Sequence, residues 1–504
     1  MNQFRKVIQM WDWQIQNKDF LNRTINRCRE QKIILPTFQQ LKHPHAIPKK
    51  IQEDLQHINL NDLNPLNLFR INWCNDPETG RIGDINFVEI PQEITCVKSR
   101  IIGLVGKYFP TGAHKVGATY GCLVPYLITG RFDPDYHKAV WPSTGNYCRG
   151  GVFNSNLLSV HSVAILPEEM SQERFEWLRE RGAEVYATPG CESNVKEIYD
   201  KCHELEAQSD EYLIFNQFDQ FGNTIWHYEI TGFAIEKLFE QVKLPGERLS
   251  AFVSATGSAG TIAAGDYLRK KFPRIKILAT EALQCPTLLM NGFGGHRIEG
   301  IGDKHVPWIH NIKNLDCVCD IDDEHTLNIL RLFNEPAGHE FLNKKNIDRD
   351  MLQKLPLLGI SSICNLLSAI KLAKYFEFNE NDIIFTIFTD SVDLYHSRLK
   401  EMNGKFGKYT INQAELDWNS YIKNQKIDYF KELNYYDKKT IHNLKYFTWV
   451  EQQGKNVEEL NAQWYDENYW NERFSIVSTW DQLIDEFNNN VGISGEKLSL
   501  LSYG

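Results

Sequence analysis

VSATGSAGTIAAG, residues 253 to 265, is the stretch that decides the fold. It has the pattern of an apolar strand, a loop of glycine and small hydroxyl residues, and the start of a helix. Such a loop presents backbone N–H groups at a helix N-terminus, where a phosphate dianion is held best. The stretch has neither the Gly-Lys-Ser/Thr ending of a Walker loop nor a GxGxxG pattern. It therefore predicts a phosphorylated small cofactor rather than a nucleotide, with a structural tight turn as the alternative.

Short apolar runs alternate with helical patterns on both sides of this stretch. The runs include SRIIGLVG, HSVAILP, EYLIFN, RIKILATE and DIIFTIF. Strands and helices that alternate in this way indicate parallel sheets with helices on both faces. Because such sheets bind ligands at the carboxyl ends of their strands, the loops that follow the apolar runs are the candidate site.

Two of these loops carry candidate reactive groups. FPTGAHKVGATYG, residues 109 to 121, places Lys115 at a helix start, where desolvation and the helix end lower the pKa and favour the neutral amine that Schiff-base chemistry needs. The alternative is a solvated lysine near a helix cap. PSTGNYCRGG, residues 142 to 151, is rich in turn residues, and Asn146 is suited to donate to an oxygen of a bound ring. A plain turn or a helix cap is the alternative there.

A fourth segment, IIFTIFTDSVDLYHSRL, is a predicted strand with a polar end. Thr389, Asp390 and Ser391 lie at that end and are suited to meet a heterocyclic nitrogen. Because neighbours on a strand point to opposite faces, only one of Asp390 and Ser391 should reach such a ring.

The composition of the 504 residues excludes several classes of function. With 42% hydrophobic and 24% charged residues, the chain is typical of a globular protein, and its net charge of −10 argues against nucleic acid as a partner. Residues 1 to 21 lack the apolar core of a secretory signal, and no stretch predicts a membrane span. The 11 scattered cysteines favour reduced thiols in a cytoplasm. Cys317 and Cys319 are predicted as buried thiols of a strand, and no metal is expected.

The segments resemble, in order and spacing, the fold-type-II, or tryptophan synthase β-like, class of pyridoxal-phosphate enzymes. PTGAHK looks like the lysine motif of tryptophan synthase β chains. STGN, NQFDQFGNTIWHYEITG, ATGSAGTIAAGDYLRKKFPRIKILATE, HRIEGIGDKHVP, LGISSICNLLSAIKLA and TDSVDLYHSRL look closer to cysteine synthase and cystathionine β-synthase. The resemblance covers about residues 66 to 399. It departs from that pattern at Ala259, where cysteine synthases have a glycine, and at Tyr147 and Cys148, where a smaller pair is usual.

The resemblance implies pyridoxal 5'-phosphate as the cofactor and gives a role to each matching residue. Lys115 would be the catalytic residue and would hold the cofactor as a Schiff base, and Asn146 would bond its ring hydroxyl. The phosphate would lie on Gly257, Ser258, Ala259, Gly260 and Thr261, with His114 as a further contact. Ser391 would meet the pyridine nitrogen. The substrate carboxylate would be held by Ser143, Thr144, Gly145 and Gln217.

The resemblance also implies the domain organisation. We expect an α/β fold of two doubly wound parallel-sheet domains with the cofactor between them, in a catalytic core over residues 64–403. A smaller mobile domain, about residues 115–235, would be inserted in the larger one. Residues 1–63 would form an N-terminal helical extension and residues 404–504 a C-terminal helical, aromatic-rich extension. A homodimer is implied by the resemblance.

The expected activity is β-replacement or β-elimination on an amino acid through an aminoacrylate, as in cysteine synthases. A threonine or serine dehydratase, or a threonine-synthase-like enzyme, is the nearest alternative. A non-catalytic subunit or binding protein that keeps the fold is the alternative from another class, and the presence of Lys115 argues against it.

Overall fold

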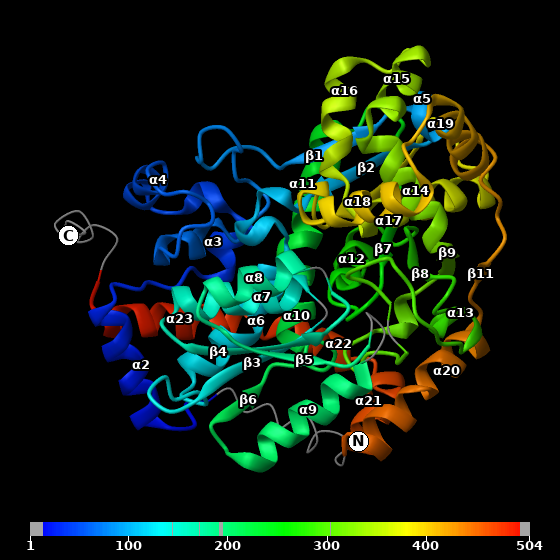
Figure 1. Cartoon of the computed structure of the whole chain (residues 1–504). Helices are drawn as coiled ribbons and strands as arrows, with labels where there is room; N and C mark the ends of the chain where they lie inside the picture. The colour runs from blue at the N-terminus through cyan, green and yellow to red at the C-terminus, as the bar shows by residue number, and fades with distance from the viewer. Residues whose placement is uncertain (1–13, 144, 171, 191–194, 303, 494–504) are drawn as a thin grey trace.

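Two β-sheets lie side by side in the computed structural model, which describes residues 14–143, 145–170, 172–190, 195–302 and 304–493 (Figure 1). The larger sheet has the strand order β1-β2-β10-β7-β8-β9-β11. Its strands are β1 Phe87–Ile90, β2 Arg100–Val105, β7 Arg248–Ala255, β8 Lys276–Ala282, β9 Cys317–Ile321, β10 Asp382–Phe388 and β11 Phe430–Glu432. Strands β2, β10, β7, β8 and β9 are parallel, and β10, buried along its whole length, lies inside this sheet, as expected for a parallel sheet covered on both faces.

The smaller sheet is parallel throughout and has the order β5-β4-β3-β6. Its strands are β3 Lys138–Pro142, β4 His161–Pro167, β5 Glu184–Thr188 and β6 Tyr212–Ile214. Helix α7 (Asn146–Leu157) covers one face and α9 (Val195–Gln208) the other (Figure 1). The fold class is therefore the α/β arrangement of parallel sheets that the alternation of apolar runs and helical patterns predicts.

The helices of the core join the two sheets into one molecule. Besides α7 and α9, the core helices are α5 Gln92–Thr95, α6 Lys115–Ile128, α8 Gln172–Glu180, α10 Phe221–Trp226, α11 Gly232–Val242, α12 Ala264–Lys271, α13 Thr287–Met290, α14 Asp323–Asn334, α15 Pro336–Lys344, α16 Arg349–Lys354, α17 Ile360–Tyr375 and α18 His396–Phe406. Helix α17 packs on β10 and β7 of the larger sheet, and α6 packs between α7 and α10 beside the smaller one.

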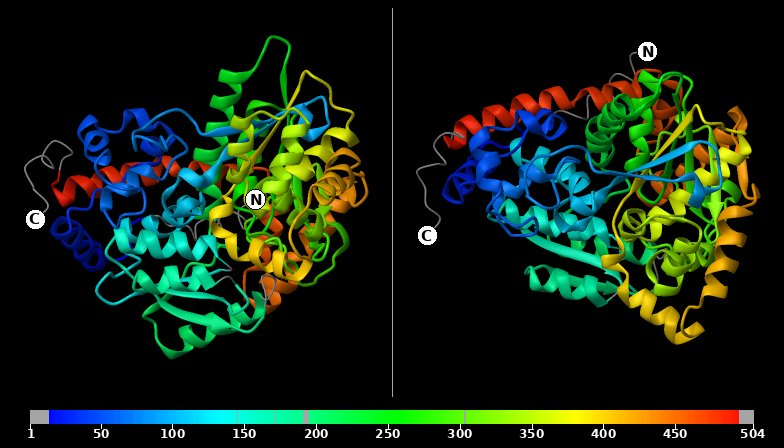
Figure 2. Two further views of the ribbon diagram at one scale, coloured as in Figure 1. Left: turned by 45° about the horizontal axis from the view of Figure 1, so that its top comes forward. Right: turned by 90° about the horizontal axis from the view of Figure 1, so that it is seen from above.

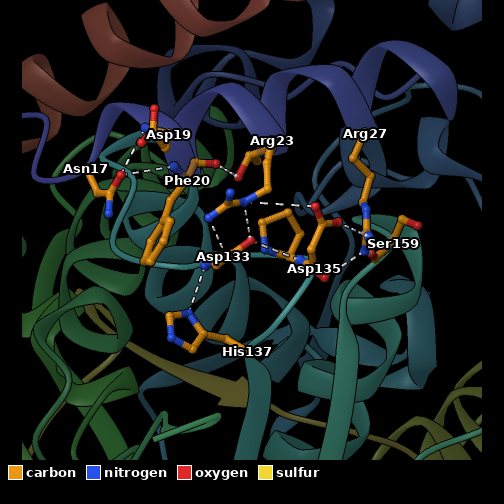
Figure 3. Close-up of polar contacts among 11 residues, drawn as sticks. Asn17, Asp19, Phe20, Arg23, Arg27, Asp133, Asp135, His137 and Ser159 are labelled. Carbon is orange, nitrogen blue, oxygen red and sulfur yellow. Dashed lines mark hydrogen bonds and ion pairs between the residues drawn. The ribbon is translucent and has the colours of Figure 1, made fainter.

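The N-terminal helices α2 (Lys18–Glu30), α3 (Phe38–Lys42) and α4 (Lys49–Leu55) precede the core. Helix α2 is tied to the loop before β3 by arginines (Figure 3). Arg23 pairs with Asp133 at 2.7 Å, and Arg27 donates to the carbonyl oxygens of Pro134 and Ser159, each at 2.8 Å. This extension is thus fixed to the smaller sheet by charge-assisted hydrogen bonds.

The C-terminal segment wraps back to the N-terminal helices. Its helices are α19 Ile411–Trp418, α20 Tyr435–Asn443, α21 Val457–Tyr465, α22 Tyr469–Ser475 and α23 Val477–Val491. Helix α23 runs along α2 and α3 (Figure 2). Asp481 accepts from the backbone N–H groups of Phe38 (2.6 Å) and Gln39 (3.1 Å), at the start of α3. A carboxylate there satisfies donors that have no partner within the helix, so each extension stabilises the other.

One feature of the C-terminal extension differs from the helical character expected for it. Strand β11 pairs antiparallel with β9 and extends the larger sheet. Its alternation is too short to be read from the sequence. The physical reason for its presence is that β9 would otherwise expose a row of unpaired backbone groups at the sheet edge.

Among the described residues, no single helix has both the length and the apolarity needed to cross a bilayer. One bent pair, Arg349–Leu357 with Ile360–Tyr375 at 113°, meets the criterion when its two helices are taken together.

Candidate cofactor and substrate site

Lys115 is the first residue of α6 and faces the loop that follows β7. Two 3-10 turns after β2 lead the chain to this position. The Lys115 Nζ donates to Ser258 Oγ at 3.0 Å, so the lysine and the small-residue loop are brought together across 143 residues of sequence. Burial lowers the pKa of the Lys115 amine to about 8. The lowered pKa increases the fraction of the amine that is neutral near neutral pH, which is the form that acts as a nucleophile.

The loop from Gly257 to Gly260 supplies a bed of backbone donors between β7 and the turn that starts α12. Within the described residues, none of its four backbone N–H groups donates to a protein acceptor. A β-carbon at Gly260 would lie 1.9 Å from Asn223 Oδ1, so no side chain fits there. Ala259 has φ +60°, a left-handed conformation that glycine adopts at lower cost. Unpartnered donors at a helix start fit the phosphate of the expected cofactor.

The loop between β3 and α7 forms the opposite wall. Ser143 Oγ accepts from the Gly145 N–H and from Gln217 Nε2, each at 3.2 Å. Because both lone pairs of this oxygen are engaged, the Ser143 hydroxyl proton is left to donate to a ligand. Thr144, the remaining residue predicted for the substrate carboxylate, lies outside the described residues. The other three are brought together as a compact polar group.

A cavity of about 700 Å³, counted with its open mouth, lies between these loops. Its lining includes nearly all the predicted residues: Lys115, Ser143, Asn146, Gln217, Gly257, Ser258, Ala259, Gly260 and Thr261.

Three of the predicted residues that the structure describes are not in the cavity lining: Gly145, His114 and Ser391. Strand β10 ends at Phe388, so the alternation we used for Asp390 and Ser391 does not apply. Ser391 Oγ instead accepts from the Asp393 N–H at 3.4 Å, and the hydroxyl residue at this wall is Thr389. Ser391 therefore does not line the cavity, because the chain turns into a 3-10 helix (Val392–Leu394) directly after it, and its contact with the ring stays a prediction.

His114 lies behind the wall rather than in it. Its Nε2 is 3.3 Å from Thr389 Oγ1, and its ring meets that of His227 edge-on at 4.9 Å. Burial, followed by the proximity of Lys115, lowers the pKa of His114 to about 3, so the ring is neutral. A neutral, buried imidazole behind Thr389 supports that side chain, and its contact with the phosphate stays a prediction.

Asp390, the other residue considered for the ring nitrogen, is also absent from the cavity lining. Its carboxylate accepts from Asn146 Nδ2 (2.6 Å) and from the Tyr395 hydroxyl (2.7 Å). Burial raises the pKa of Asp390, whereas these two donors act in the opposite direction. The carboxylate thus orients Asn146 from behind, and Asn146 Oδ1 has no partner among the described residues.

Two side-chain amides without a role in the sequence-based prediction, those of Asn223 and Asn365, hold the loops of the site together. Asn223 Nδ2 donates to Ser258 Oγ (3.0 Å) and to the Gln217 carbonyl (2.9 Å), which joins the lysine side of the site to the substrate side. Asn365 joins β7 to β10 through the Ala255 N–H and the Ile387 carbonyl. Both lie in the segments NQFDQFGNT and LGISSICN, so the motifs contained the signal but gave no role to these residues.

Comparison with known proteins agrees with this geometry. Residues 107–338 match the family model described as pyridoxal-phosphate dependent enzyme. The chain is 30% identical over 216 residues to a probable cysteine synthase of Bacillus subtilis, a match that covers 43% of this chain and 68% of the relative. It is 24% identical over 308 residues to the cystathionine beta-synthase of Saccharomyces cerevisiae, which covers 59% of this chain and 57% of the relative.

Solved structures show the same fold. O-acetyl serine sulfhydrylase isoform 3 from Entamoeba histolytica superposes with a TM-score of 0.54 at 21% identity, covering 67% of this chain and 92% of that chain. A hydrogen sulfide-producing enzyme from Fusobacterium nucleatum gives 0.53 at 23% identity, covering 61% and 95%. Together with the buried Lys115, the donor loop and the sheet topology described above, these matches show that the chain belongs to the pyridoxal-phosphate-dependent enzyme family, with the fold-type-II architecture.

Proposed function

We propose that this chain catalyses β-replacement in the manner of a cysteine synthase. The substrate would be an amino acid with a leaving group on its β carbon, such as serine or an activated serine, and the second substrate a nucleophile such as sulfide. The observation that carries the proposal is the contact between Lys115 Nζ and Ser258 Oγ at 3.0 Å, which places a lysine of lowered pKa against the donor loop. The matches to cysteine synthases support the reaction class.

The residues of the donor loop and Asn146 would hold the cofactor. Gly257, Ser258, Ala259, Gly260 and Thr261 would bind its phosphate through backbone N–H groups, and Lys115 would hold its aldehyde carbon. When bound, pyridoxal phosphate supplies an electron sink for bonds at the amino-acid α carbon. Thr389, rather than Ser391, is the hydroxyl side chain that the end of β10 gives to this wall, and Asp390 fixes the amide of Asn146.

Lys115 would also move the proton of the reaction. Of the described residues that line the cavity, it alone carries an amine, and a pKa of about 8 lets that amine accept a proton from the substrate α carbon and release it again. A base with a pKa near the working pH is the most efficient for such a transfer.

The substrate carboxylate would lie against the turn after β3. Ser143 is fixed by Gly145 and Gln217 and keeps its proton for donation, and Gln217 is fixed in turn by Asn223. These contacts orient the amino acid before reaction, which lowers the entropy lost in the transition state. Thr144 is included in this proposal on the basis of its sequence motif.

The test is an assay of cofactor-loaded protein with two sets of substrates. Cysteine formed from O-acetylserine and sulfide, faster than keto acid from serine or threonine, is the expected result. Keto-acid release as the faster reaction would assign the chain to the dehydratases instead. Protein that binds pyridoxal phosphate but turns over neither set would favour the non-catalytic alternative.

Two finer expectations belong to the same proposal. We expect a homodimer, which light scattering coupled to size exclusion tests directly. We also expect a cytoplasmic location, since the described cysteines are all free and most are buried thiols.

A further inference from the structure

Arg174 lies at the junction of the two sheets and is not among the residues of the proposed mechanism. It belongs to α8, which packs beside β5 of the smaller sheet. Its side chain is 2% exposed, although arginine is almost never fully buried unless it is paired. A buried guanidinium so close to the site needs an explanation.

The partner of Arg174 comes from the other side of the cavity. Arg174 Nη2 lies 3.0 Å from Glu299 Oε2, and the Glu299 side chain is also 2% exposed. Glu299 precedes Gly300, Ile301 and Gly302, which line the cavity. The ion pair therefore joins the helix of the smaller sheet to a loop of the larger domain.

The Arg174 guanidinium also packs against the turn that contains Gly145. A β-carbon built on Gly145 would lie 2.0 Å from Arg174 Nη1, so the arginine occupies the space beside the Gly145 α carbon. Gly145 in turn donates to Ser143 Oγ. One side chain thus contacts the turn proposed to bind the substrate carboxylate and, through Glu299, the loop opposite it.

We infer that Arg174 is a positioning residue that holds the Gly145 turn and the Glu299–Gly302 loop in register across the mouth of the cofactor cavity. The consequence for the substrate carboxylate rests on the proposed function. A planar guanidinium suits this role, because its fork of donors can face two groups at once, whereas an ammonium is a single point.

Arg398 of α18 provides a matched control. Its Nε donates to Glu299 Oε1 at 2.7 Å, but its side chain is 27% exposed and also pairs with Glu401. Replacing Arg398 or Arg174 by glutamine removes the same charge from the same carboxylate. The guanidinium that fills the space beside Gly145 is that of Arg174.

The experiment compares hydrogen exchange in the cofactor-loaded wild type, Arg174→Gln and Arg398→Gln without substrate. In Arg174→Gln we expect exchange at the amides of Arg149 and Gly302, which donate to the Gly145 and Thr256 carbonyls, to be about tenfold faster or more. In Arg398→Gln we expect less than about threefold. Equal exchange in the two variants, or no change in either, would overturn the inference.

Kinetics add a second readout. KM for the amino acid should rise about tenfold in Arg174→Gln, with kcat and cofactor affinity changed much less. Glu299→Gln should act in the same direction, and the double variant should be no worse than the worse single one, because both remove one interaction. If Arg174→Gln does not fold, Arg174→Lys keeps the charge without the fork and should show a smaller loss of the same protection. The exchange result stands even if no amino acid is turned over, an outcome that would overturn the proposed function alone.

Discussion

Lys115 in the cofactor cavity and Lys445 in the C-terminal extension are both buried, and burial lowers the pKa of both amines. Lys445 Nζ donates to three oxygens, the carbonyls of Trp308 (2.9 Å) and His310 (2.7 Å) and the side chain of Gln463 (2.8 Å). Lys115 Nζ has one hydrogen bond to the described part of the chain and lines a cavity. A lowered pKa is therefore shared by Lys445, which is fully hydrogen-bonded, and by Lys115, which we propose to be reactive. The number of hydrogen-bond partners and the neighbouring cavity distinguish the two lysines.

The largest expected effect follows from Lys115→Ala. Turnover should fall by at least about a thousandfold, because the nucleophile and the proton carrier are lost together. The absorbance band near about 410 nm expected for a Schiff-base cofactor should also vanish. Since this amine makes one protein hydrogen bond, the urea midpoint should change little. Retained absorbance in the variant would place the Schiff base on another lysine.

The rate at which the cofactor-free protein captures pyridoxal phosphate should depend on pH through Lys115. With a pKa of about 8, the amine is mostly protonated below pH 8 and mostly neutral above it. The rate should therefore rise about tenfold per pH unit up to about pH 8 and then level off. Stopped-flow absorbance measures it. A rise that continues toward pH 10.5 would mean that the lysine is not desolvated in the cofactor-free protein.

Lys445→Met should lower stability and leave turnover unchanged, the reverse of what we expect for Lys115→Ala. Three buried oxygens would lose their donor, so the free energy of unfolding should fall by about 2 to 4 kcal/mol, with no change in turnover per folded molecule. Urea unfolding followed by tryptophan fluorescence checks this. Lys431→Met, at a half-exposed lysine paired with Asp437, is the control and should change stability by about 0.5 kcal/mol or less. Loss of turnover without loss of stability in Lys445→Met would contradict the structural role that we assign to Lys445.

The smallest effect is expected for Ser391→Ala, measured beside Asp390→Ala. The Ser391 hydroxyl, the group that the substitution removes, has one hydrogen bond among the described residues, from the Asp393 N–H at 3.4 Å, so turnover should stay within about twofold. Asp390→Ala removes the acceptor of both Asn146 and Tyr395 and should lower turnover about tenfold or more. Equal losses of turnover in the two variants would show that the Ser391 hydroxyl contributes to the reaction.

Much of the site was predictable because its parts are local. A loop of small residues between a strand and a helix has one good use for its backbone donors, so Gly257 to Thr261 could be assigned from their own stretch. Lys115 at a helix start, and Ser143, Gly145 and Asn146 in one turn, were equally local. Whether Ser391 lines the cavity could not be read in the same way, because its direction depends on where β10 ends, and a strand end is set by the chain that packs against it.

The sequence by itself determined the α/β class, because this depends on hydrophobic periodicity. Through the resemblance of its motifs to a known family it also gave the cofactor and predicted which lysine would hold it, because each motif lies within a single segment. The tertiary structure alone decided which groups meet across the cavity: Asp390 with Asn146, Asn223 with Ser258, and Arg174 with Glu299 and Gly145. It also decided that the two extensions pack on each other through Asp481 and α3. These contacts join residues tens to hundreds of positions apart, and their geometry is fixed only once both sheets and their helices have packed.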